Sequence, residues 1–154
     1  VSHTTRAPRV GEEHGREYYF TSINDFENLL KEDGFIEYAK VFKNYYGTSK
    51  SEIDRLLAAG KNIILEIDWQ GAEQIRAIYK DKAKSIFILP PSLEELRNRL
   101  ETRNTDSKEV IDHRMNEAEN EISHAKDYDC ELINDDFDKI LEKLKEYLST
   151  TTKN

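Results

Sequence analysis

The sequence predicts an α/β fold with a parallel sheet, and two features of its second half indicate this. Short apolar runs with the length of buried strands occur at 62–67, 85–89 and 130–133. Helix-like stretches follow these runs, at 72–79, 93–103 and 137–148. Strands that alternate with helices are joined by right-handed crossovers, which place neighbouring strands parallel. We therefore expect a three-stranded parallel sheet with flanking helices.

The first sixty residues predict a smaller α+β lobe. Residues 24–27 (Asn-Asp-Phe-Glu) form a candidate capping box, which opens a helix that should stop at Gly34. The apolar and aromatic run 35–42 is a candidate strand. A second capping box at 49–52 should open another helix, ending near Gly60.

These patterns divide the chain into four expected parts. They are a lobe over 1–60, a sheet core over 61–98, an arginine-rich helical segment over 99–127, and a last strand, helix and tail over 128–154. The polar end of the chain, 149–154, is expected to fray.

The composition excludes several functional classes. The chain has 154 residues and a formal net charge of -8, from 31 acidic and 23 basic residues. Broad binding to nucleic acid or to a membrane surface requires a cationic face, which this balance disfavours. The apolar runs are far too short to span a membrane. A single cysteine, Cys130, excludes an internal disulfide and suits a reducing compartment.

An acidic protein that binds an anion must concentrate its arginines locally, and one candidate group lies near the start. Arg6 and Arg9 flank Pro8, so a stiffened loop would hold two phosphate-binding guanidinium groups at a fixed separation. Tyr18 and Tyr46 could add hydroxyl donors. The alternative is that these arginines belong to an ordinary solvated surface.

A second arginine group follows residue 96. Arg99 and Arg103 are four apart and would share one helix face, and Arg114 follows after the segment 104–107. Arginines on a movable segment can stabilise the charge of a phosphoryl group in transfer. The alternative is surface ion pairing with nearby glutamates, which we expect for Arg97.

Three acidic or amide side chains lie in or beside predicted strands. Glu37 is in the run 35–42, where most glutamates face water. Asp68 follows the run 62–67, where it could contact a ligand or a magnesium shell, or cap the next helix. Asn134 follows the run 130–133, at the edge where parallel sheets bind ligands.

Taken in order, the motifs of this chain resemble those of guanylate kinase over nearly its whole length. They are SHTTRAPRVGE at 2–12, FIEYA at 35–39, NYYGT at 44–48, ILEIDWQG at 64–71, ILPPS at 88–92, the RLETR and HR pieces after residue 98, and INDD at 133–136. Taken alone, NYYGT is better interpreted as part of an ordinary hairpin, and the other interpretation is a turn that aims side chains inward. Each motif is weak alone, whereas the ordered set is specific.

The resemblance implies a P-loop kinase-type core, a GMP-binding lobe and a helical arginine lid. It also implies three groups of site residues. The GMP phosphate would be bound by Arg6, Arg9, Tyr18 and Tyr46. The guanine base would be bound by Glu37, Ser2 and Thr48, with Asp68 close by. ATP and the transferred group would be bound by Arg99, Arg103 and Arg114, with Asn134 near adenine. ATP would be accompanied by Mg²⁺, and a cytoplasmic location is implied.

Two departures from the family's pattern are visible. Glu66 stands where the family usually has aspartate, one methylene shorter. No Gly-x-x-x-x-Gly-Lys-Ser/Thr phosphate loop, which in the family precedes the segment at Ser2, occurs in the chain. We therefore expect a fragment, missing the first strand and the P-loop, that retains the GMP site without turnover.

The alternative is a non-catalytic guanylate-kinase-like module that binds protein ligands. The joint presence of Glu37, Arg99, Arg103 and Arg114 favours the enzyme, because an interaction module has no use for a phosphate-gripping lid.

Overall fold

The chain has a mixed α/β fold that separates into two compact units. The computed structural model describes residues 1–154 except 42, 104, 105 and 152–154. Contacts divide the chain into Val1–Ala83 and Lys84–Asn154. The four-part division expected from the sequence stays a prediction.

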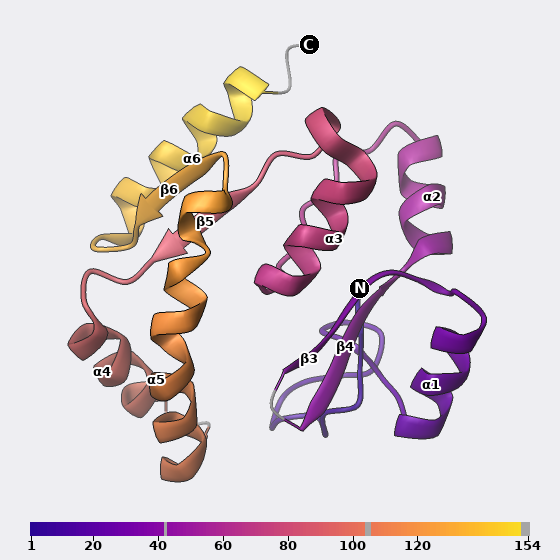
Figure 1. Ribbon diagram of the computed structural model, residues 1–154, viewed down its shortest axis with the longest axis horizontal. Helices are drawn as coiled ribbons and strands as arrows, with labels where there is room; N and C mark the ends of the chain where they lie inside the picture. Colours follow the sequence, from indigo (N-terminus) through magenta and orange to yellow (C-terminus); the bar gives the residue numbers. More distant parts are fainter. Residues whose placement is uncertain (42, 104–105, 152–154) are drawn as a thin grey trace. The chain divides into compact units, whose positions relative to one another are not determined.

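The first unit is built on a small sheet flanked by helices (Figure 1). Its strands lie in the order β2-β1-β4-β3, with β1 parallel to β2 and the other neighbours antiparallel. The elements are β1 (His3–Thr4), β2 (Tyr19–Phe20), α1 (Ile23–Lys31), β3 (Phe35–Val41), β4 (Asn44–Ser49), α2 (Lys50–Ala58), α3 (Trp69–Tyr79) and the 3-10 helix η1 (Lys80–Lys82).

The caps of α1 differ from the predicted capping box. Ser22, not Asn24, caps the helix, and its hydroxyl accepts a hydrogen bond from the Asp25 amide at 3.1 Å. The helix ends at Lys31, because Asp33 takes a left-handed conformation with φ 55. The Gly34 amide then donates back to the Leu29 carbonyl at 2.9 Å, which completes a Schellman-type end.

The hairpin interpretation of 44–48 is confirmed, because these residues form most of strand β4, which pairs antiparallel with β3, whereas the inward-aiming turn is wrong. Gly47 lies within the strand, where a Cβ atom would come within 2.9 Å of the Phe35 ring and 3.0 Å of the Phe26 ring. These two rings stack at 4.4 Å in the core of the unit. The predicted strand 35–42 is confirmed as β3, and Phe42 lies outside the described residues.

The predicted strand at 62–67 is also wrong, since residues 61–68 adopt neither strand nor helix. A strand requires a hydrogen-bonded neighbour, and no described residue pairs with this segment. Its Ile64 side chain is 75% exposed. The segment leads instead into α3, which begins three residues earlier than predicted and is capped by Asp68.

The second unit contains the predicted parallel pairing, between β5 (Ile86–Leu89) and β6 (Cys130–Ile133). Among the described residues this sheet has two strands, not three. The helices are α4 (Leu93–Arg103), α5 (Lys108–Ser123), the 3-10 helix η2 (Ala125–Asp127) and α6 (Phe137–Thr151). The expected fraying at 149–151 is wrong, because α6 continues through these residues, and 152–154 lie outside the description.

Helices α4 and α5 lie alongside each other in Figure 1. Ser92 caps α4 as predicted, accepting from the Glu95 amide at 3.1 Å. Arg97 forms the expected surface ion pairs, to Asp112 at 2.9 Å and to Glu101 at 3.7 Å. Within the part of the chain that is described, no helix is long and apolar enough to cross a membrane.

Candidate functional site

A row of hydrogen-bonded polar side chains crosses the sheet of the first unit. Glu37 on β3 faces Thr48 on β4, and both are buried, with 3% and 4% of their surface exposed. The Thr48 hydroxyl donates to Glu37 Oε1. Ser2 Oγ lies 3.0 Å from Thr48 Oγ1. Because the Thr48 proton is directed at Glu37, Ser2 must be the donor to Thr48 in this chain of bonds.

Glu37 is buried because the strand is irregular at this point. The register shifts between Phe35 and Glu37, and Phe35, Ile36 and Glu37 are all buried in succession. A bulge of this kind redirects side chains that would otherwise alternate between faces. The water-facing alternative for Glu37 is therefore wrong.

Helix α3 leaves room for the Glu37 carboxylate only because residue 71 is glycine. A Cβ atom there would lie 2.5 Å from Glu37 Oε2, which is a severe overlap. The carboxylate thus lies between a hydroxyl on β4 and bare backbone on α3. Any larger residue at position 71 would displace the carboxylate or the helix.

Burial raises the pKa of the Glu37 carboxyl above its ordinary value. The Thr48 hydrogen bond opposes this effect, while the negative charge of Asp68 adds to it. Glu37 therefore holds its proton to a higher pH than an exposed glutamate does.

Asp68 caps helix α3, which was one of the two roles considered for it from the sequence. Its Oδ1 accepts from the Gly71 amide at 3.0 Å, and its Oδ2 accepts from Gln70 Nε2 at 3.1 Å. The cap positions a second carboxylate close enough to Glu37 to influence its titration.

Arg6, Tyr18 and Tyr46 lie together as a second cluster. The Arg6 guanidinium lies 5.5 Å from the centre of the Tyr18 ring, and the Tyr18 and Tyr46 rings meet edge to face at 5.9 Å. Arg6 Nη2 bonds Glu12 Oε1 at 2.9 Å, and the side chain of Arg6 is only 15% exposed. The cluster therefore offers a fixed cation beside two phenol groups.

Glu12 is a structural residue of this cluster that the sequence analysis did not single out. Its second oxygen accepts from the Arg9 backbone amide at 2.7 Å, so one carboxylate fixes both arginine positions of the loop. The hydrogen bond from Arg6, followed by that from Arg9, lowers the pKa of Glu12. The acid three residues after Arg9 was the available signal, because a carboxylate there can accept from the Arg9 amide across the turn from Arg9 to Glu12.

The two clusters lie on one face of the sheet. Tyr46 and Thr48 are two residues apart on β4, so their side chains point the same way, about 7 Å apart along the strand. This face can hold a planar group with adjacent N–H donors at Glu37 and an anionic group at Arg6. A separate hollow, lined by His3, Tyr19, Phe35 and Ser49 among others, contains none of the predicted site residues.

In the second unit, three of the four predicted donor-side residues line one hollow. It has a volume of about 190 Å³ and is lined by Ile88, Leu89, Pro90, Leu96, Arg99, Leu100, Arg103 and Asn134. Asn134 follows β6, and its backbone N–H donates to the Leu89 carbonyl at 2.8 Å. Arg99 is held by Glu95, with Nε to Oε1 at 2.6 Å. The hollow thus combines an apolar floor with two cations and an amide.

Arg114 is not among the described residues that line this hollow. It lies on α5, with Nη2 3.7 Å from Asp106 Oδ2. The predicted lid also includes residues 104 and 105, which lie outside the described residues.

Comparison with known proteins gives consistent matches. The family model described as guanylate kinase matches residues 1–151. A guanylate kinase of Francisella tularensis subsp. tularensis is 72% identical over 147 residues, covering 96% of this chain and 77% of the relative. One from Haemophilus influenzae is 56% identical, covering 97% and 72%. A crystal structure of guanylate kinase from Anaplasma phagocytophilum aligns with a TM-score of 0.86 at 35% identity, over 100% of this chain and 75% of that one.

The raised pKa of Glu37 predicts a stability effect that depends on pH. At a pH above its raised pKa, the buried Glu37 carboxylate is charged, and its desolvation destabilises the folded state. At a pH below the ordinary pKa of 4.5, the carboxyl is neutral in both the folded and the unfolded state. Glu37→Gln should therefore raise the melting temperature at pH 7.5 and leave it almost unchanged below pH 4.5. Thermal unfolding of both proteins at the two pH values measures this. Glu27→Gln, an exposed change on α1, is the matched control. An equal shift at both pH values would show that the carboxylate charge is not the cause.

Proposed function

This chain belongs to the guanylate kinase family, and we propose that its Glu37 side chain recognises the guanine base of GMP. The reaction transfers the γ-phosphoryl group of ATP to GMP and gives ADP and GDP. The observation that carries the proposal is the buried Glu37 carboxylate, linked through Thr48 to Ser2.

Guanine presents its N1–H and 2-amino groups side by side, and a carboxylate can accept both. Adenine has an acceptor at N1 and no 2-amino group, so the same carboxylate would repel it. Guanine O6 requires a donor. The Thr48 proton is directed at Glu37, so Ser2 is the hydroxyl that is able to turn toward O6. Asp68 is the polar neighbour that we place beside the base.

The GMP phosphate would bind at the cluster of Arg6, Tyr18 and Tyr46, with Arg9 from the same loop. Glu12 holds Arg6 before any ligand arrives, which reduces the entropy lost on binding. Thr48, at the proposed base end of the site, and Tyr46, at the proposed phosphate end, are two residues apart on β4, which is about 7 Å.

For the donor side we propose a P-loop kinase-type core with a helical lid that carries Arg99, Arg103 and Arg114. These arginines would hold the ATP phosphates and the transferred group, and Asn134 would lie near adenine. The apolar hollow with Arg99, Arg103 and Asn134 on its lining supports this assignment. The GMP phosphate would attack the γ-phosphorus in line, which requires positioning and charge neutralisation rather than a covalent intermediate.

Mg²⁺ would enter with ATP, and it would supply positive charge at the transferring phosphates. Kinases hold this ion largely through substrate phosphates and water, with few carboxylates. The described residues contain no group of three or more potential metal-ligating side chains. The chain's part is therefore to orient the substrates around the ion.

Glu37→Gln should weaken GMP binding by about 2–4 kcal/mol. The amide places a donor against one of the two guanine donors and removes a charged hydrogen bond. Calorimetric titration of GMP into both proteins measures the difference. Glu27→Gln, the exposed change on α1, is a suitable control. Equal GMP affinity in the Glu37→Gln protein would remove Glu37 from the base pocket.

Arg99→Ala or Arg114→Ala should each lower kcat about a hundredfold, the scale of charge stabilisation in phosphoryl transfer. The test uses the chain joined to the phosphate-loop segment of a guanylate kinase, because its own sequence contains no such motif. The unjoined chain should bind GMP without turnover. Arg97→Ala, on the same helix but paired with Asp112, is the matched control and should retain kcat. A raised KM for GMP with kcat intact would contradict the assignment of these arginines to the donor side.

A further inference from the structure

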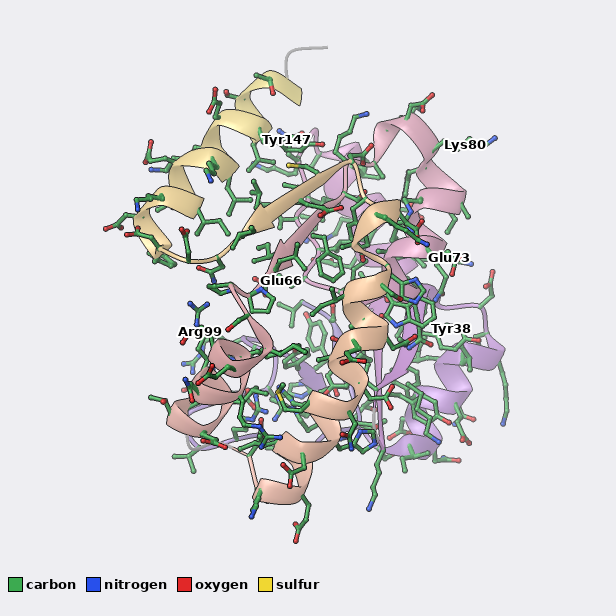
Figure 2. The ribbon with its side chains drawn as sticks, turned by 60° about the vertical axis from the view of Figure 1, so that its left-hand side comes forward. Tyr38, Glu66, Glu73, Lys80, Arg99 and Tyr147 are labelled. Carbon is green, nitrogen blue, oxygen red and sulfur yellow. The ribbon has the colours of Figure 1, made fainter. Side chains whose placement is uncertain are left out.

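Strand β3 is the outer strand of its sheet, and its free edge is covered by one side chain. In the order β2-β1-β4-β3, and within the described part of the chain, hydrogen bonds to a neighbouring strand occupy one side of β3. On the other side, helix α3 packs against β3. Tyr38 on the strand and Glu73 on the helix mark these two elements in Figure 2.

Gln74 on α3 forms two hydrogen bonds with the backbone of Tyr38. The Tyr38 amide donates to Gln74 Oε1 at 3.1 Å, and Gln74 Nε2 donates to the Tyr38 carbonyl at 2.8 Å. The side-chain amide therefore takes the place of a backbone amide from a further strand. Nε2 also donates to the Gln70 carbonyl at 3.1 Å, so both of its protons are used.

These bonds lie close to an irregular point of the strand. The register shift interrupts the ladder to β4 between Phe35 and Glu37, and regular pairing resumes at Glu37, one residue before Tyr38. A bulge leaves backbone without regular partners. The Gln74 amide fixes the strand from its opposite edge, one residue after Glu37.

The same helix also limits where the Glu37 carboxylate can lie. Gly71, one turn before Gln74, comes so close that an added Cβ would be 2.5 Å from Glu37 Oε2. The spacing between α3 and β3 therefore sets the position of Glu37 Oε2, while the Thr48 hydroxyl bonds Oε1. Gln74 joins the two elements through hydrogen bonds to both the N–H and the C=O of one residue, Tyr38.

We propose that Gln74 is a positioning residue for guanine recognition, which acts by holding the backbone beside Glu37. The inference rests on the proposed role of Glu37 in the base pocket. It predicts that Gln74 affects the two-point contact to guanine more than binding of the remainder of the nucleotide. A residue needed only for folding would lower the amount of active protein without changing base selectivity.

The test compares GMP with inosine 5′-monophosphate (IMP), which has the N1–H of guanine but lacks the 2-amino group. The ratio of the two affinities reports how well the carboxylate is aligned with both donors. Gln74→Ala and Gln74→Glu should each reduce the GMP-to-IMP affinity ratio about tenfold, the scale of one hydrogen bond to a charged group. Gln74→Glu keeps the volume but turns the donor into an acceptor facing two carbonyl oxygens, so it separates hydrogen bonding from packing.

Glu73→Ala is the matched control, because Glu73 is the exposed neighbour on the same helix. It should leave the ratio unchanged. Titration stoichiometry counts the folded molecules in each sample. A normal ratio with reduced stoichiometry in both Gln74 variants would overturn the proposal and leave Gln74 a structural residue. Failure of Glu37→Gln to weaken GMP binding would instead refute the base pocket itself, so the two failures are distinguishable.

Discussion

Burial of an ionised carboxylate costs several kcal/mol unless hydrogen bonds replace the lost water. In the first unit this cost falls on Glu37, and the neighbouring structure is arranged to hold it. The bulge turns the side chain inward, Thr48 donates to one oxygen, and Gly71 leaves room for the other. The negative charge of Asp68 adds to the cost of ionising this carboxyl. Under the proposed function, a base with two adjacent N–H donors would stabilise the charged form.

The two ends of this sheet face differ in how they are prepared. At the proposed phosphate end, Glu12 pairs with Arg6 and holds the loop, so the position of the guanidinium is already fixed. At the proposed base end, the Glu37 carboxylate is buried away from water. In the second unit, an apolar hollow carries Arg99 and Arg103 on its lining. Each unit thus carries groups suited to one of the two nucleotides.

The sequence predicted the elements that have local signals. Its predictions were wrong where the structure of a segment depends on contacts with residues distant in the chain. The cap of α4 is a local signal, since Ser92 and the Glu95 amide are three residues apart. The apolar runs of β5 and β6 form strands because each run has the other as its hydrogen-bonded neighbour. The run 62–67 has the same composition as a buried strand, yet a strand depends on a neighbour that composition does not specify. Likewise, the burial of Glu37 depends on a bulge, and the role of Glu12 on a folded loop. The residue types at the site were predictable from motifs, whereas their mutual support was not.

The protonation of Glu37 gives the most direct test of this account. Carboxyl carbon resonances of the chain, followed by NMR against pH, report the pKa of Glu37 with and without GMP. Burial should hold this pKa above that of exposed glutamates in the free chain. Saturating GMP should lower it, because two guanine donors stabilise the charged form, while AMP should not. A Glu37 pKa that stays at its free-chain value, or rises, when GMP is bound would contradict the central claim.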